Sequence, residues 1–177
     1  MTTTASPLLD TERTDLLEML AKHRHFLRFT TRELTDEQAR MRTTASELTL
    51  GGLIKHVAAV EANWAKFIVE GPAAGPDFSS MSEAEIAEWS NKFVLLPDET
   101  LAGVLAEYEQ VAARTDELVR TLPDLNVSQP LPEAPWFEPG GRWSARRVFM
   151  HIMTETAQHS GHADIIRESL DGAKSMG

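Results

Sequence analysis

The sequence contains no cysteine in its 177 residues. The chain therefore has no disulfide framework, no thiolate nucleophile of its own and no zinc finger or ribbon. Any metal must be bound by histidine and carboxylate side chains. The longest apolar runs are far shorter than the roughly 20 residues that cross a bilayer, so we expect no membrane partner. The N-terminus shows no basic flank and no apolar segment of a secretory signal, which predicts a cytoplasmic protein.

Basic residues are scarce relative to acidic ones. The sequence has 17 lysines and arginines against 27 aspartates and glutamates, which gives a net charge of −10. An acidic surface repels phosphate backbones, and no stripe of basic residues provides a local exception, so we expect no nucleic-acid partner. The fractions of 42% apolar and 25% charged residues are ordinary for a globular protein and exclude a disordered or fibrous chain.

Four long stretches show the spacing of apolar residues that is typical of amphipathic helices. They cover residues 8–34, 49–71, 97–122 and 145–171. Ser144 is a favourable N-cap for the last of these helices, and Gly172 is a suitable residue just beyond its end. Capping-box spacings follow residue 35 and residue 82, and they predict a short helix after the first and another over residues 83–89.

The segments between the helices complete the prediction of the fold. Residues 71–80 have the composition of a loop, and residues 123–141 contain five prolines and two adjacent glycines, so we expect an irregular segment there. No strand pattern of useful length is present. We predict an all-α four-helix bundle with long crossover connections and one or two short extra helices. Residues 8–172 form this single domain, with a flexible tail over residues 1–7 and a C-terminal tail over residues 173–177.

The last helix carries the residues that point to chemistry. At about 100° per residue, Val148, Ile152 and Ile166 define its core face, and Glu155 and His159 fall in the middle of that face. Burying an unpaired carboxylate costs several kcal/mol. The i, i+4 spacing directs both side chains to one point, where a divalent cation would offset the desolvation of both groups.

A third donor comes from the second long helix, where His56 lies at the border of the apolar stripe. His56, Glu155 and His159 form a set of two histidines and one carboxylate. Such a set suits Zn²⁺, Ni²⁺ or Fe²⁺, with further positions left for water or substrate. His162, at the edge of the same face of the last helix, is a reserve ligand or an outer partner of the site.

Each of these residues also has a purely structural interpretation. Glu155 could form a salt bridge with a buried arginine or lysine, and Glu61 is a candidate for that kind of pair. His151 and His162 could be ordinary histidines at a helix interface. Gly161 lies in mid-helix, where glycine costs about 1 kcal/mol relative to alanine, which predicts that another backbone or a ligand approaches closely.

Aromatic and basic residues gather near the start of the last helix. Trp136 and Trp143 could line a pocket there. Arg142, Arg146 and Arg147 could hold a carboxylate of a cofactor, or could lie on the solvated surface. The sequence alone leaves both interpretations open.

Two segments resemble a known superfamily. Residues 51–64, GGLIKHVAAVEANW, are similar to the second helix of the DinB/YfiT-like superfamily of metalloenzymes, and residues 151–168, HIMTETAQHSGHADIIRE, to its C-terminal helix. The resemblance spans nearly the whole chain. It implies a four-helix bundle, often a homodimer, that holds a divalent metal through three side chains, here His56, Glu155 and His159. Many members have histidine at all three positions, and the middle Glu155 is similar to the subgroup of mycothiol-dependent maleylpyruvate isomerase.

The resemblance implies a metal-dependent transferase that uses a low-molecular-weight thiol on a small electrophilic substrate. Zinc is the favoured metal, with nickel or iron as alternatives. Because the chain has no cysteine, the sulfur would come from the thiol cofactor. Three other functions fit the same ligands: a metal-dependent hydrolase that acts through activated water, a ferrous oxygenase, and a non-catalytic metal-binding stress-response protein.

Overall fold

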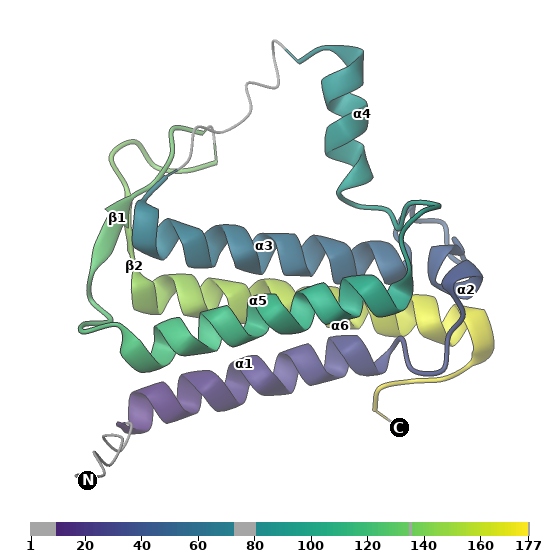
Figure 1. The fold of residues 1–177 in the computed structure, drawn as a ribbon, viewed down its shortest axis with the longest axis horizontal. Coiled ribbons are helices and arrows are strands. Elements are labelled where there is room, and N and C mark those ends of the chain that lie inside the picture. Colours follow the sequence, from purple (N-terminus) through teal and green to yellow (C-terminus); the bar gives the residue numbers. More distant parts are fainter. Residues whose placement is uncertain (1–9, 73–80, 135, 177) are drawn as a thin grey trace, which may run out of the picture.

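The computed structural model describes residues 10–72, 81–134 and 136–176. Within them, four long helices lie side by side: α1 (Thr11–Phe29), α3 (Leu50–Glu70), α5 (Leu101–Thr121) and α6 (Ala145–Asp171) (Figure 1). Two short helices, α2 (Asp36–Arg40) and α4 (Glu83–Asn91), and two short strands, β1 (Ser128–Pro130) and β2 (Arg142–Ser144), lie in the connections. The predicted all-α four-helix bundle is confirmed. The predicted tail over residues 1–7 and most of the predicted loop over residues 71–80 lie outside the described residues.

Side chains that cap the helix ends explain where the helices begin and end. The Thr49 side chain accepts a hydrogen bond from the backbone of Gly52 at the start of α3, and the Ser144 side chain accepts one from the backbone of Arg147 at the start of α6. Gly172 ends α6 in the left-handed conformation, with φ of 81°, which glycine adopts without strain. The bounds predicted for α6 are therefore confirmed.

Several predicted helix bounds are wrong. The first helix begins at Thr11, after its N-cap Asp10, rather than at residue 8, and α4 ends at Asn91 rather than at residue 89. The first helix ends at Phe29 rather than residue 34, because the buried Arg167 side chain donates hydrogen bonds to the carbonyls of Thr30 and Arg32 (2.9 and 2.8 Å) and so stabilises a turn. The third long helix begins at Leu101 rather than residue 97. There the Thr100 side chain accepts a hydrogen bond from the backbone of Gly103, which fixes the first turn.

The directions of the helices require one long crossover. In Figure 1, α1 and α6 run one way along the bundle, and α3 and α5 run the other way. Because α3 and α5 are parallel neighbours, the connection between them returns along the length of the bundle, and α4 lies in it. The connection between α5 and α6 stays at one end. As a result α6 packs antiparallel against α3, which brings the two ligand-bearing helices together.

The segment between α5 and α6 contains two strands that the sequence analysis did not predict. They pair antiparallel, with Gln129 opposite Trp143, and each has only three residues. Such strands are too short for an alternating pattern to be visible in the sequence. Backbone hydrogen bonds from Ala145 to Val127 and from Arg146 to Leu125 then fix the first turn of α6 against this segment.

A buried polar layer crosses the core at mid-height. Two apolar clusters occupy the two ends of the bundle, one around Leu53, Tyr108 and Ile166, and the other around Leu20, Val119 and Phe149. Between them each long helix contributes one or more buried polar side chains. These are Arg24 from α1, Glu61 from α3, Thr115 from α5 and Thr156 from α6.

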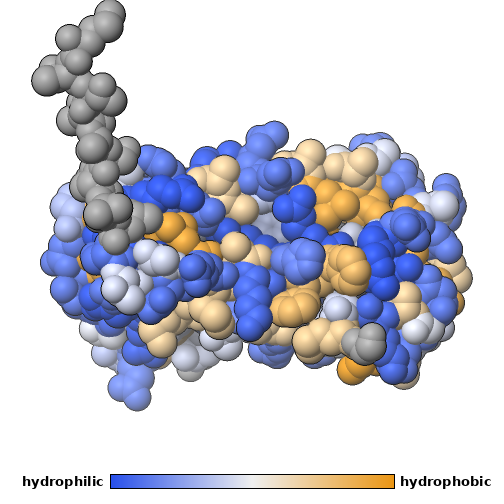
Figure 2. All heavy atoms as spheres, turned by 90° about the horizontal axis from the view of Figure 1, so that it is seen from below, coloured by the Kyte–Doolittle hydropathy of each residue, from blue (hydrophilic) through white to orange (hydrophobic). Residues whose placement is uncertain are grey.

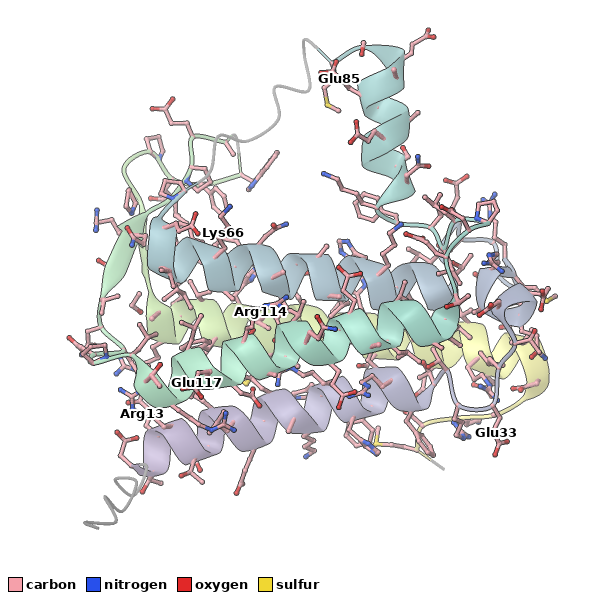
Figure 3. All side chains as sticks on the ribbon, viewed as in Figure 1. Arg13, Glu33, Lys66, Glu85, Arg114 and Glu117 are labelled. Carbon is pink, nitrogen blue, oxygen red and sulfur yellow. The ribbon has the colours of Figure 1, made fainter. Side chains whose placement is uncertain are left out.

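The outside of the bundle is charged and mixed in polarity. Lys66, Arg114 and Glu117 project from the outer surfaces of α3 and α5 (Figure 3). The face that carries α1 shows apolar side chains scattered among hydrophilic ones (Figure 2). Among the described residues, no helix has both the length and the apolar content that a bilayer span requires.

Candidate metal centre

The structure brings the three predicted donors together between α3 and α6. His56 comes from the second turn of α3, and Glu155 and His159 come from consecutive turns of α6. One ligand atom from each residue lies within 4.8 Å of the other two. His159 Nε2 is 3.7 Å from Glu155 Oε2, and the rings of His56 and His159 meet edge to face with their centres 4.8 Å apart.

This geometry fits a divalent cation after small side-chain movements. Donors about 2.1 Å from a tetrahedral Zn²⁺ lie about 3.4 Å from one another. The Glu155 and His159 pair is close to that value, at 3.7 Å, and the widest separation in the cluster, 4.8 Å, must shorten by more than about 1 Å. Rotation about side-chain bonds can supply such a change without moving the helices, since all three residues are only half-buried.

The prediction that Glu155 and His159 occupy the middle of the buried face of α6 is wrong. Because α6 packs against both α1 and α3, the centre of its buried face is at Thr156 and Ala163, which are 1% and 0% exposed. The Glu155 side chain lies at the edge of this face and is 29% exposed. The donors therefore lie where a ligand from solvent can reach them.

No basic side chain of the described residues other than histidine forms an ion pair with Glu155. Its carboxylate oxygens have His151 Nε2 at 3.8 Å and His159 Nε2 at 3.7 Å as neighbours. The alternative of a salt bridge between Glu155 and a buried arginine or lysine therefore has no support within the described ranges. Glu155 is therefore available as a ligand together with His56 and His159.

Glu61, by contrast, is the structural acid that the sequence analysis suggested. Its side chain is fully buried and accepts hydrogen bonds from Nε and Nη2 of Arg24, and Nη1 of Arg24 also bonds Asp116 at 2.7 Å. Burial alone would lower the pKa of Arg24, but the hydrogen bonds and charges of the two carboxylates raise it overall. The prediction of a buried pair at Glu61 is confirmed.

Both histidine donors are held in the form that binds metals. Burial lowers the pKa of His56, and the charge of Glu155 offsets this only in part. Burial also lowers the pKa of His159, and the neighbouring His56 lowers it further. Both imidazoles are therefore neutral at pH 7, with a nitrogen lone pair available for a cation.

His162 contacts the far side of one donor. Its Nδ1 is 3.4 Å from Nδ1 of His159, whereas Nε2 of His159 faces Glu155. A hydrogen bond between the two Nδ1 atoms would fix the tautomer of His159 and leave Nε2 free to bind a cation. The position fits the predicted outer partner, and His162 is not in the cluster of three donors.

Aromatic rings line one side of the donor cluster. Trp64 of α3 and Trp143 of β2 stack with ring centres 4.8 Å apart, and Phe137 packs edge to face on both. His151 packs edge to face against both tryptophans, at 4.9 and 5.0 Å. We refer to Trp64, Phe137, Trp143 and His151 as the aromatic wall. That Trp143 lines a ligand pocket stays a prediction, and Trp136 lies on the surface with 66% of its area exposed.

On the other side of the cluster, Phe93 packs over His56 with ring centres 4.8 Å apart. The backbone at Phe93 packs directly against Gly52 of α3. An added Cβ at Gly52 would lie 2.1 Å from the carbonyl oxygen of Phe93, so glycine is needed for this contact. The prediction of a close approach at Gly161 is wrong, because an added Cβ at that position meets nothing within 4 Å among the described atoms. The sequence analysis missed Phe93, and no pattern in the sequence marks it.

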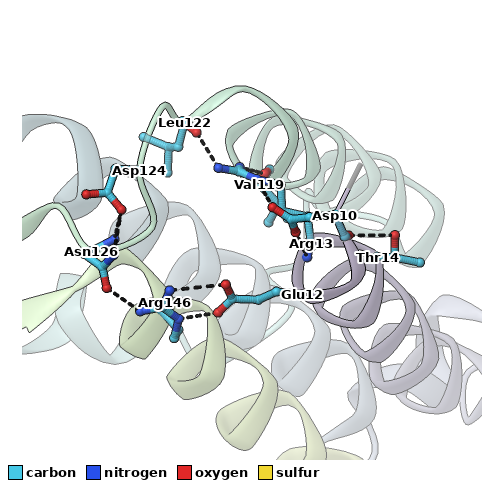
Figure 4. A network of polar contacts seen from close by, with 9 residues as sticks. All are labelled: Asp10, Glu12, Arg13, Thr14, Val119, Leu122, Asp124, Asn126 and Arg146. Atoms are coloured by element: carbon cyan, nitrogen blue, oxygen red, sulfur yellow. Dashed lines mark hydrogen bonds and ion pairs between the residues drawn. The ribbon is translucent and has the colours of Figure 1, made fainter. Parts of the chain in front are cut away.

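The three arginines near the start of α6 have different neighbours. Arg146 binds Glu12 of α1 and the side chain of Asn126, which fastens the start of α6 to the rest of the bundle (Figure 4). Arg142 binds Ser128 across the two strands. Arg147 lies over the ring of Trp143 at 4.6 Å and so contacts the aromatic wall. A role of these arginines in holding a cofactor stays a prediction.

A separate groove of about 680 Å³ lies between α1 and α5. Arg24, Arg28 and Arg32 line it, but none of the three metal donors does. The charge of Arg24 is already matched by Glu61 and Asp116. This groove is therefore not part of the candidate centre.

The model of the mycothiol-S-transferase family matches residues 15–172, which is most of the chain. The chain belongs to the mycothiol-S-transferase family. No curated protein matches it. This family is part of the DinB/YfiT-like superfamily, in agreement with the resemblance seen in the sequence. Membership implies a divalent metal, the thiol mycothiol as partner and a small-molecule substrate.

Proposed function

We propose that this protein transfers mycothiol to a small electrophile with the help of a divalent metal held by His56, Glu155 and His159. The observation that carries the proposal is the meeting of three donor atoms within 4.8 Å at a half-exposed position between α3 and α6. The family match supports the choice of thiol. The cytoplasmic location and the homodimer stay predictions.

The side chains around the donors have separate tasks in this proposal. When bound, the cation lowers the pKa of a coordinated thiol, so that a thiolate is present near neutral pH. Glu155 supplies the negative charge of the donor set, and the partial exposure of its side chain leaves room for a ligand. The aromatic wall and Phe93 lie on two sides of the donors, where they exclude water and offer apolar surface to the electrophile.

Zinc is the metal we propose first, because two imidazoles and one carboxylate with an open fourth position are the ligands of many catalytic zinc sites. Nickel or iron would bind the same donors. A purely structural zinc site usually has four protein ligands, and the described residues bring three together here. The open position therefore favours a catalytic centre over a non-catalytic metal-binding protein.

The test is a three-component assay with full-length protein purified without a metal-affinity tag. Zinc-loaded protein is mixed with mycothiol and 1-chloro-2,4-dinitrobenzene, and the thioether is quantified by mass spectrometry. We expect product formation that requires protein, metal and mycothiol together. His56→Ala should abolish the protein-dependent rate, and His25→Ala, which changes an exposed histidine of α1, should not.

Other outcomes of this assay would refute the proposed transfer. Metal-dependent conversion of 1-chloro-2,4-dinitrobenzene to the phenol, with chloride released and no thioether formed, would indicate a hydrolase that uses activated water. Zinc binding without turnover of a panel of electrophiles would indicate a metal-binding protein. A thioether rate that is unchanged by His56→Ala would place the chemistry outside this centre.

A further inference from the structure

We infer that His151 is a positioning residue that holds one oxygen of Glu155, so that the other oxygen faces His56 and His159. The inference rests on the proposed metal centre, because it assigns a role relative to Glu155 as a ligand. His151 lies one helical turn before Glu155, and His159 lies one turn after it. Glu155 is therefore flanked by imidazoles on both sides along the same face of α6.

The two carboxylate oxygens of Glu155 have different neighbours. Oε1 is 3.8 Å from His151 Nε2, and Oε2 is 3.7 Å from His159 Nε2. The second oxygen is therefore the one beside His159, whose ring meets that of His56. If Oε2 binds a cation, Oε1 is left for a hydrogen-bond donor, and the described residues place His151 there.

The imidazole of His151 is held in one orientation by the aromatic wall. Its plane is tilted by 78° to the ring of Trp64 and by 65° to the ring of Trp143, and these two rings stack on each other at 17°. The side chain is 27% exposed. Contacts with two large rings limit rotation of the imidazole, so little conformational entropy remains to be lost when Nε2 donates a hydrogen bond.

A hydrogen bond from His151 to Glu155 would strengthen metal binding. Carboxylates that bind metals are themselves hydrogen-bonded, and removing the partner typically costs about 10–100-fold in metal affinity. The separation of 3.8 Å exceeds a hydrogen bond of about 3.0 Å, so the carboxylate must move by about 0.8 Å toward Nε2. A carboxylate fixed in this way presents one oxygen, rather than both, to the cation.

The test compares two substitutions of His151 in the full-length protein. His151→Phe keeps a ring packed against the two tryptophans and removes the donor, whereas His151→Gln places an amide N–H near the position of Nε2. Zinc affinity is measured by competition with a chromophoric chelator, and the cobalt-substituted proteins are compared by absorption spectroscopy. His25→Phe, at an exposed position of α1, is the matched control.

We expect His151→Phe to weaken zinc binding about 10–100-fold, and His151→Gln to restore most of the affinity. The cobalt spectrum should keep the ligand-field bands of two nitrogen donors in each variant. Melting of the zinc-free proteins should stay close to that of the control, which shows that the change is not a folding defect.

Three results would overturn the inference. Unchanged affinity in His151→Phe would show that His151 has no role, while the metal centre itself would stand. A cobalt spectrum that loses a nitrogen ligand in both variants would make His151 a direct ligand. If the unsubstituted protein does not bind zinc, or if His56→Ala leaves its zinc affinity unchanged, the metal centre is refuted and this inference with it. Absence of thiol transfer alone would refute only the proposed reaction.

Discussion

Replacing Glu61 by glutamine should strongly destabilise the folded protein without affecting its metal site. The Glu61 side chain is 0% exposed and its partner Arg24 is 6% exposed, so the substitution leaves a buried guanidinium with one charged partner fewer. Breaking such a pair costs about 3–5 kcal/mol. Asp116 still contacts Arg24, which places the expected cost near the lower end, at about 3 kcal/mol. For a chain of this size that loss lowers the melting temperature by about 6–12 °C.

Glu155→Gln is the matched substitution at the other acid, and it should behave in the opposite way. The Glu155 side chain is 29% exposed and has no arginine or lysine partner among the described residues, so the metal-free protein should melt within about 3 °C of the unsubstituted one. Zinc at about 100 times its dissociation constant stabilises a native-state site by about 2.7 kcal/mol. Glu155→Gln should lose most of that stabilisation, whereas Glu61→Gln should keep it.

The assay is thermal unfolding of the three proteins, each with zinc and with a chelator. If Glu155→Gln lowers the melting temperature in chelator as much as Glu61→Gln does, Glu155 is a structural acid and the assignment of the two carboxylates fails. If Glu61→Gln costs less than about 1 kcal/mol, the reasoning from burial is wrong.

Three further predictions follow from burial and packing. Burial lowers the pKa of His23, His56, His151 and His159 below the usual 6.5, so the unfolded chain takes up protons first as the pH falls. The metal-free protein should therefore be most stable above about pH 6.5 and melt at lower temperatures between pH 6.5 and 5, and a flat profile would contradict this. Tyr108→Phe should change the free energy of unfolding by less than about 1 kcal/mol in calorimetry, because the contact of the buried hydroxyl with Thr156 does not meet the geometry of a full hydrogen bond, whereas a larger loss would show that this contact is one. In urea denaturation Gly161→Ala should stabilise by about 0.5–1 kcal/mol and Gly52→Ala should destabilise, since only the second added Cβ meets a backbone atom; equal effects would refute the packing at Phe93.

The helices could be predicted from the sequence where their signals are local. Thr35 and Gln38 form the capping box that their spacing indicates, and Ser144 and Gly172 bound α6 as expected. The prediction failed where distant residues decide the structure. Arg167 stabilises the turn after α1 from 135 residues or more along the chain, and nothing in the local sequence of residues 30–34 shows that contact.

The donor set could likewise be predicted because it depends on helical spacing. The i, i+4 relation of Glu155 and His159 places both on one side of α6, and His56 lies on the helix that packs against it. The burial of Glu155 and His159 could not be predicted, because it depends on which faces of α6 pack against α1 and against α3. Phe93 and Phe137 were not predicted either, since irregular segments bring these two rings to their positions.

Elemental analysis of protein purified without a metal-affinity tag tests the metal centre most directly. The unsubstituted chain should carry about one divalent metal ion, and His56→Ala and Glu155→Gln should each lose it while remaining folded by circular dichroism. An unsubstituted protein that neither contains nor binds such a metal, or variants that retain it in full, would contradict the assignment of His56, Glu155 and His159 as a metal site.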